Sequence, residues 1–134
     1  EFVAEAKNRA VKMTSVEECF VMGSERLLRS AIENVLRNAV RYTKMGTTVE
    51  VSLRNGGGKA SVVIRDYGDG VPQSELKNLF RPFYRVSESR DRGSGGTGLG
   101  LAIAEQAIRL HRGTIEARNE PAGLAVEIKL NCTN

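Results

Sequence analysis

A glycine-rich turn between two β-type segments is the feature that most constrains the fold. Residues 47–53 and 59–66 have strand character and are joined by Asn55-Gly56-Gly57-Gly58, a strong hairpin signal. A second pair, residues 114–117 and 124–130, predicts a closing hairpin. Because strands occur in hairpins and are separated by helical segments, the pattern favours an α+β sandwich over a parallel, doubly wound sheet.

Helical periodicity predicts one long and two shorter helices. Ser24 is a suitable N-cap for a helix ending near Tyr42. A short helix is expected from Gln73 to Phe80 after Pro72, and a third from Thr97 or Gly98 to about Gly113. The apolar face predicted for the long helix comprises Leu28, Ala31, Ile32, Val35, Leu36 and Ala39, and that of the third helix comprises Leu99, Ala102, Ile103, Ala107 and Leu110.

The remaining segments are assigned from composition. Residues 1–10 are expected to form a short helix or a linker, and residues 11–16 and 19–22 two short strands. Residues 81–96 are charged, rich in Ser and Gly and aperiodic, which predicts a mobile loop. The 134 residues suit one domain, 1–134, with a single core.

Composition excludes several classes of protein. No apolar run approaches the roughly 20 residues that cross a bilayer, so this segment is not expected to be embedded in a membrane. The net charge of +4 comes mainly from arginine, but only 5% of residues are aromatic, which argues against nucleic-acid binding. Cys19 and Cys132 form no CxxC pair and His111 is the only histidine, so we expect no zinc site and two reduced cysteines.

The glycine-rich segment Gly93-Ser94-Gly95-Gly96-Thr97-Gly98-Leu99-Gly100 leads into the third helix. Glycines allow a close backbone approach to an anion, and a helix N-terminus offers unpaired N–H groups, so phosphate binding is predicted. A dinucleotide fold would need a buried strand directly before it, and a P-loop would need a terminal GK[ST], neither of which is present. Taken alone, the segment also fits a flexible linker.

Two further motifs carry polar groups. Asp66, in Asp66-Tyr67-Gly68-Asp69-Gly70, extends the apolar face of its strand, so it is either a buried carboxylate that can pair with an adenine amino group or the start of a turn. Asn34, Asn38 and Tyr42 are spaced i, i+4, i+8 along one edge of the long helix. Amide oxygens are good ligands for Mg²⁺, although a single mid-helix Asn is usually a solvated polar residue.

In this order, the three motifs resemble the N, G1 and G2 boxes of histidine kinases, within the gyrase, Hsp90, histidine kinase and MutL group of ATPases with the Bergerat fold. Phe80-Arg81-Pro82-Phe83-Tyr84-Arg85 is similar to the F box that opens their ATP lid, here residues 81–96. The stretch 80–103 most resembles Cpx-type envelope-stress sensor kinases. The resemblance implies a two-layer sandwich in which a mixed, mostly antiparallel sheet of about five strands packs on three helices.

The resemblance also implies the site. Asn38 would bind Mg²⁺ with help from Asn34, Asp66 would recognise adenine, Tyr42 would flank the base, and Phe80 and Phe83 would anchor the lid. Whether Asp69 faces solvent is left open, and His111 is expected to be structural. The implied catalytic residues are Asn34, Asn38 and Arg85, and the implied ATP contacts are Asn34, Asn38, Arg41, Tyr42, Asp66, Gly68, Gly70, Val71, Phe80, Arg85, Gly96, Thr97, Gly98, Leu99, Gly100 and Leu101.

One position favours phosphoryl transfer over hydrolysis. The water-activating ATPases of the group carry Glu one turn before the metal-binding Asn, whereas this chain has Asn34, which cannot accept a proton at neutral pH. Glu33 is rotated about 100° away, where an ion pair with Arg37 would explain it.

The implied partners are ATP or ADP, an upstream dimerising helical domain that carries the acceptor histidine, and a response regulator. The domain would be cytoplasmic, in a longer protein of the bacterial inner membrane. A serine kinase resembling anti-sigma factors and a non-catalytic nucleotide-binding module of the same fold are the alternatives.

Overall fold

A single mixed sheet organises the chain in the computed structural model, which describes residues 2–3, 9–84 and 98–133. The strand order is β1-β2-β3-β4-β6-β5. β2 runs parallel to β3, and the other described neighbours are antiparallel. The strands are β1 (Phe2–Val3), β2 (Ala10–Val16), β3 (Thr48–Gly56), β4 (Lys59–Arg65), β5 (Thr114–Asn119) and β6 (Leu124–Asn131).

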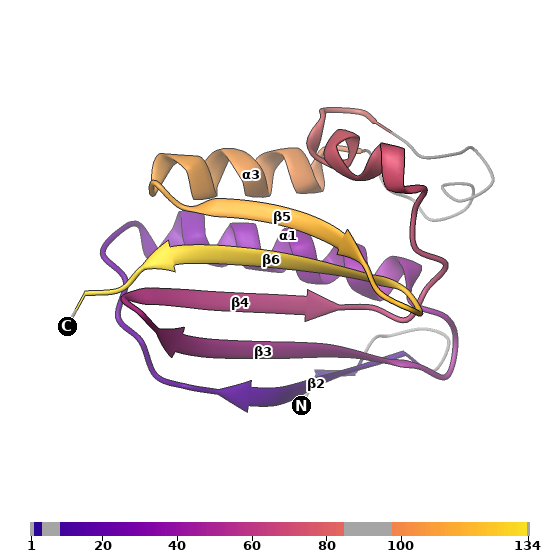
Figure 1. The fold of residues 1–134 in the computed structure, drawn as a ribbon, viewed down its shortest axis with the longest axis horizontal. Helices are drawn as coiled ribbons and strands as arrows, with labels where there is room; N and C mark the ends of the chain where they lie inside the picture. Colours follow the sequence, from indigo (N-terminus) through magenta and orange to yellow (C-terminus); the bar gives the residue numbers. More distant parts are fainter. Residues whose placement is uncertain (1, 4–8, 85–97, 134) are drawn as a thin grey trace.

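Helices cover one face of this sheet. They are α1 (Glu25–Tyr42), the 3-10 helix η1 (Gln73–Phe80) and α3 (Gly100–Leu110). Figure 1 shows α1 behind β4 and β6, with α3 alongside it near β5. The predicted α+β sandwich is confirmed: five longer strands and the two-residue β1 pack against three helices within the described residues.

The β3–β4 hairpin forms at the predicted glycines. Gly56 pairs with Lys59, which leaves Gly57 and Gly58 as a two-residue turn. Their φ angles are +62° and +78°, values that strongly favour glycine. The turn sets the register in which alternate strand residues face the helices, because a slip of one residue would turn every side chain to the other face.

Helix α1 begins as the sequence predicts. The Ser24 side chain accepts a hydrogen bond from the Leu27 N–H at 3.2 Å and so caps the helix. Three residues of the predicted stripe, Ala31, Val35 and Ala39, are buried, and Leu28, Ile32 and Leu36 pack against the core while partly buried. The helix therefore presents a narrow apolar seam to the sheet and keeps its flanking edge for polar side chains.

Helix α3 buries a face that overlaps the predicted one only at Ala107. It buries Leu101, Ala104, Ala107 and Ile108, whereas Ile103 and Leu110 of the predicted face are 46% and 67% exposed. The helix also begins at Gly100, two to three residues later than expected. Because apolar residues occur on more than one side of this helix, the periodicity alone does not identify the face that packs on α1 and the sheet.

The predicted face of α3 instead borders an apolar groove of about 520 Å³. Phe80, Pro82, Leu99, Ile103 and Leu110 contribute to its walls.

The amino-terminal segments also differ from expectation. Residues 1–10 were expected to be helix or linker, but Phe2 and Val3 pair with β2, and Ala10 already belongs to that strand. Residues 19–22 form only an isolated bridge, between Phe20 and Thr133. An amphipathic pattern of four residues is too short to distinguish a strand from an extended connector.

The prediction of two reduced cysteines is wrong, because the structure contains a disulfide next to this bridge. The bridge brings together two positions 113 residues apart, and Cys19 and Cys132 form a disulfide with a Cα–Cα distance of 6.2 Å. The sequence separation concealed this contact, which the fold creates by placing the connector before α1 beside the chain end after β6.

Reducing this disulfide is expected to lower stability substantially. A crosslink across so long a loop restricts the unfolded chain, and disulfides typically contribute about 2–4 kcal/mol. For a domain of this size the melting temperature should fall by roughly 10 °C. Thermal denaturation with and without dithiothreitol tests this, and a Cys132→Ser variant that melts like the oxidised chain would contradict it.

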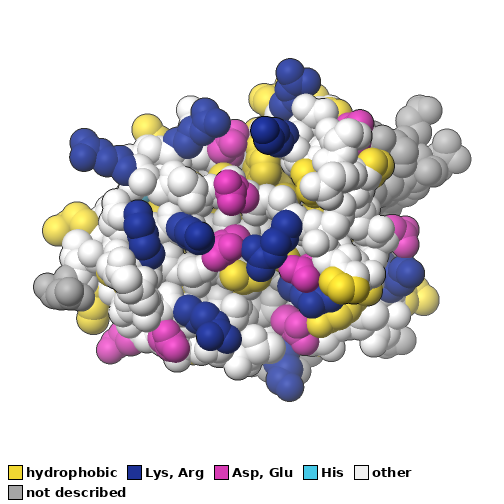
Figure 2. Space-filling view, viewed as in Figure 1, with side chains coloured by type: hydrophobic (Ala, Val, Ile, Leu, Met, Phe, Trp, Pro, Cys, Tyr) yellow, Lys and Arg dark blue, Asp and Glu magenta, His cyan; other side chains and the backbone are white. Residues whose placement is uncertain are grey.

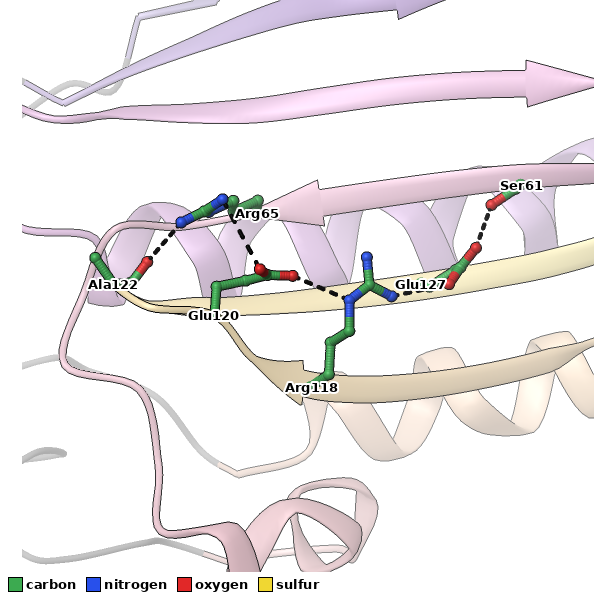
Figure 3. A network of polar contacts seen from close by, with 6 residues as sticks. All are labelled: Ser61, Arg65, Arg118, Glu120, Ala122 and Glu127. Carbon is green, nitrogen blue, oxygen red and sulfur yellow. Dashed lines mark hydrogen bonds and ion pairs between the residues drawn. The ribbon is translucent and has the colours of Figure 1, made fainter.

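The helix-free face of the sheet carries charges of both signs (Figure 2). Figure 3 shows part of it, in which Ser61 donates to Glu127, and Arg118 joins Glu127 at 2.9 Å and Glu120 at 3.0 Å. The hydrogen bond from Ser61, and then the one from Arg118, lower the pKa of Glu127. These contacts connect β4, β5 and β6 on the side away from the helices.

Glu127→Gln should therefore destabilise the domain in a pH-dependent manner. A lowered folded-state pKa contributes stability above the ordinary value of 4.5, and this contribution disappears as the pH falls through the folded-state pKa. We expect a loss of about 0.5–1 kcal/mol at pH 7 that shrinks in acid. Urea titrations at pH 7 and in acid measure this loss of unfolding free energy, with the exposed Glu33→Gln as the control. An equal loss under the two conditions would contradict the prediction.

Candidate functional site

The polar edge of α1 forms one wall of the candidate site. Asn34, Asn38 and Tyr42 are all half-buried along it. The Asn34 Nδ2 donates to the Ser30 carbonyl at 2.9 Å, which fixes the orientation of the amide and leaves its oxygen facing away from that carbonyl. Within the described residues, Asn38 makes no side-chain hydrogen bond, so its amide is available to a ligand.

The expected ion pair between Glu33 and Arg37 is not among the contacts of the described residues. The Arg37 guanidinium instead lies 3.5 Å from the Asn34 Oδ1.

The N-terminus of α3 lies against this edge. A Cβ at Gly100 would stand 3.2 Å from the Asn34 Oδ1, a tight distance that shows how closely the start of α3 approaches this amide. Leu99, the N-cap residue, makes no side-chain cap. Within the described residues, no side-chain cap therefore occupies the first N–H groups of α3, as in helix ends that bind anions.

Gly98 holds the segment before α3 in place. Its φ angle is +81°, and a Cβ there would lie 2.8 Å from the Phe83 Cα. The Phe83 N–H donates to the Gly98 carbonyl at 2.8 Å. This contact joins the two ends of the stretch 85–97, which lies outside the described residues together with Arg85, Gly96 and Thr97 of the predicted site.

Asp66 ends β4 as a buried carboxylate, 2% exposed. Its Oδ1 accepts hydrogen bonds from the Gly68 N–H at 2.9 Å and the Leu124 N–H at 3.3 Å. Backbone donors thus offset part of the cost of burying the charge. The structure contains features of both alternatives for Asp66, because it is a buried carboxylate and its Oδ1 also holds the turn that follows.

The loop after Asp66 presses against the end of α1. A Cβ at Gly68 would lie 2.2 Å from the Tyr42 carbonyl oxygen, so the close approach requires glycine. Gly70 has a φ angle of +71°, and Val71 is buried. The structure therefore brings the predicted Asp66–Val71 loop directly beside the predicted edge of α1.

Several predicted residues take other positions. Phe80 is buried as expected for an anchor, but Phe83 is 69% exposed and does not anchor the segment through its side chain. Leu101 lies in the core, so only its main chain can face a ligand. Asp69 is exposed and lies 3.5 Å from Lys44, which answers the question left open by the sequence. Arg41 is half-buried in the last turn of α1.

His111 has a structural role, as expected. Its Nε2 accepts the Ser24 N–H at 3.0 Å, which requires the proton on Nδ1, where it faces the Ala107 carbonyl at 2.8 Å. Both ring nitrogens are therefore used to hold the end of α3 against the start of α1.

Two residues at the site were missed by sequence reasoning. The hydroxyl of the buried Thr43 accepts the Tyr67 N–H at 3.0 Å, and Asn119 bonds both main-chain groups of Val71. Thr43 directly follows the predicted motif, which was a usable signal, but nothing in the sequence links Asn119 to a loop 48 residues earlier.

The donor set indicates which metal the site can hold. Residues 2–3, 9–84 and 98–133 contain no group of three His, Cys, Asp or Glu side chains suited to a metal. The amide oxygens of Asn34 and Asn38 are hard ligands that suit Mg²⁺, with water and phosphate oxygens completing its coordination.

None of the described helices is long and apolar enough to span a bilayer.

Comparison with known proteins agrees with this geometry. Residues 23–134 match the family model of histidine kinase-, DNA gyrase B- and HSP90-like ATPases. The chain belongs to this family, and its relatives place it among the catalytic domains of sensor histidine kinases.

The sensor histidine kinase CpxA of Escherichia coli K12 is 46% identical over 101 residues, which are 75% of this chain and 22% of that protein. CusS of the same organism is 35% identical over 130 residues, 96% of this chain and 27% of the relative. The chain thus spans about a quarter of the length of these curated relatives.

Solved structures share the fold. The mycobacterial sensor histidine kinase MprB superimposes with a TM-score of 0.80 at 31% identity, covering 93% of this chain and 83% of that one. Full-length ShkA in complex with AMPPNP superimposes with a TM-score of 0.79 over 96% of this chain and 26% of that one. At 23% identity, the latter shows the fold alone.

Proposed function

We propose that this chain binds Mg-ATP and donates the γ-phosphoryl group to a histidine of an upstream helical domain in two-component signal transduction. The observation that carries the proposal is the close approach of the Asn34 amide oxygen to Gly100, where an added Cβ would lie 3.2 Å from that oxygen. This approach supports a site in which Asn34, a proposed metal ligand, lies beside the N-terminus of α3, where Leu99 makes no side-chain cap. A phosphate chain between them would meet amide oxygens through a metal on one side and N–H groups on the other.

The residues divide the task between base and phosphates. Asp66 would accept a hydrogen bond from the adenine amino group, and Tyr42 would flank the base. Gly98, Gly100 and the main chain of Leu99 and Leu101 would lie along the phosphates. Asn38, with Asn34, would hold Mg²⁺, which when bound neutralises phosphate charge. Arg41 and Arg85 would contact phosphate oxygens, Arg85 from outside the described residues.

Asn34 directs the reaction toward transfer. A neutral amide there cannot take a proton from water, so the chain lacks a general base at the position where hydrolysing relatives in the resemblance carry Glu. Phosphoryl transfer needs chiefly positioning and charge stabilisation, and an external imidazole supplies the nucleophile. The acceptor histidine and the dimer interface would belong to a longer protein, anchored in the inner membrane with this domain facing the cytoplasm. The response regulator would be a separate partner protein.

Asn38→Ala is expected to weaken ATP binding only when Mg²⁺ is present. Losing a metal ligand should lower the affinity about tenfold or more in MgCl₂ and leave binding in EDTA nearly unchanged. Isothermal titration with a non-hydrolysable ATP analogue measures both. Arg54→Ala, on the exposed end of β3, serves as the control. Equal losses with and without Mg²⁺ would remove Asn38 from the metal site.

Transfer is tested with and without the upstream region. We expect this chain to bind ATP but to remain unlabelled by γ-labelled ATP, and a version extended by its native upstream segment to become labelled on a histidine. Label on His111, both of whose ring nitrogens are occupied, or on a partner serine would overturn the proposed reaction.

A further inference from the structure

The loop from Asp66 to Val71 is attached at both ends by side chains from other elements. At its start, the Tyr67 N–H donates to the hydroxyl of Thr43, the residue that follows α1. At its end, Val71 bonds the side chain of Asn119, the last residue of β5. The two supports lie outside every motif identified in the sequence.

The hydroxyl of Thr43 is oriented by a chain of hydrogen bonds. Thr43 is 0% exposed. The Thr47 hydroxyl donates to the Lys44 carbonyl and so accepts from Thr43, whose oxygen lies 2.7 Å away. The Thr43 proton is therefore used, and its oxygen is directed at the Tyr67 N–H. Removing this hydroxyl would leave that N–H without its side-chain acceptor.

The Asn119 side-chain amide pairs with the main chain of Val71 as a neighbouring β-strand would. Its Oδ1 accepts the Val71 N–H at 3.0 Å, and its Nδ2 donates to the Val71 carbonyl at 2.6 Å. A Cβ at Gly70 would lie 2.9 Å from this Oδ1, so the neighbouring glycine is needed for the pairing. Both main-chain groups of a buried residue are thus held by one amide.

We infer that Thr43 and Asn119 are positioning residues that hold the Asp66–Val71 loop in the conformation that presents Asp66 to the adenine base. The inference rests on the proposed nucleotide site. Neither residue needs to touch the nucleotide, because both act through the loop. Thr43 also links the carboxylate that would contact the base to the helix that would bind the metal, since it directly follows Tyr42.

Isosteric variants test the inference through base selectivity. Thr43→Val removes only the hydroxyl, and Asn119→Asp keeps the acceptor but loses the donor. Each should lower the affinity for Mg-ATP about five- to tenfold while leaving the affinity for ITP, which lacks the adenine amino group, unchanged. Thr43→Ser should restore the ATP to ITP ratio. The exposed Thr114→Val and Asn131→Asp are the matched controls.

A double-mutant cycle shows whether these residues act through Asp66. In an Asp66→Asn background, Thr43→Val should have no further effect on ATP affinity, whereas a merely structural role would give additive losses. Circular dichroism at the titration temperature verifies folding. If Thr43→Val does not fold, Asn119→Asp carries the test, because Asn119 is only half-buried.

The two levels of proposal fail differently. A wild-type chain that binds no ATP, or an Asp66→Asn variant with unchanged affinity, would overturn the nucleotide site itself. The positioning role alone would be overturned if the wild-type chain binds ATP through Asp66 and the Thr43→Val and Asn119→Asp variants keep its ratio of ATP to ITP affinity.

Discussion

Gly68→Ala is expected to lower the affinity for ATP roughly 100-fold or more and to lower the free energy of unfolding by about 3 kcal/mol. The added methyl would lie 2.2 Å from the Tyr42 carbonyl oxygen. The position of the methyl is fixed by the backbone of residue 68, and the oxygen is itself a main-chain atom. The strain cannot be relieved by a rotamer change, so the loop must move away from α1. Asp66 would move with it, because its Oδ1 accepts the Gly68 N–H.

Titration calorimetry and urea denaturation measure the two parts of this prediction. The ATP affinity should fall roughly 100-fold or more, well beyond the general loss of stability. Gly56→Ala is the control, because a Cβ there meets no atom within 4 Å and the backbone needs no positive φ. A Gly68→Ala variant with native affinity would show that the loop does not need its contact with α1.

Asp66→Asn is expected to lower ATP affinity by about 10- to 100-fold with little loss of stability. The amide oxygen can still accept from the Gly68 and Leu124 N–H groups, so the turn should be retained. The new NH₂ group is a donor, and a donor cannot pair with the adenine amino group. Loss of a hydrogen bond to a charged group accounts for most of the effect.

The same substitution should change which base is preferred. Hypoxanthine carries an acceptor where adenine carries its amino group, so Asp66→Asn should bind ITP at least as well as the wild-type chain does. Competition titrations of ATP and ITP measure the ratio. The exposed Asp69→Asn, which lies on the same loop, is the matched control. Equal losses for both nucleotides would show that Asp66 supports the loop without contacting the base.

Local features of the fold were predictable because they depend on neighbouring residues. The Ser24 cap, the α1 stripe, the Gly57–Gly58 turn and the bounds of η1 each follow from a few adjacent side chains. The face of α3 was not predictable in this way. Its residues offer two apolar stripes, and the choice between them depends on α1 and the sheet, which lie far away in sequence.

Contacts between distant segments were missed for the same reason. The pairing of Cys19 with Cys132 and the bonds of Asn119 to Val71 join positions that no periodicity connects. The resemblance implies that Phe83 anchors the lid, but its side chain is exposed and its main-chain N–H donates to the Gly98 carbonyl. A motif identifies residue types, and the packing around them decides which atoms are used.

The sequence by itself determined the order and chemistry of the motifs: amides on one helix edge, a carboxylate at a strand end and glycines before a helix. These are properties of residue type and local period. Only the tertiary structure decided that the Asn34 oxygen meets Gly100, that Gly68 meets Tyr42, and that Thr43 and Asn119 hold the loop between them. Such contacts arise when the sheet and helices close around a shared core, which fixes distances that the chain order leaves free.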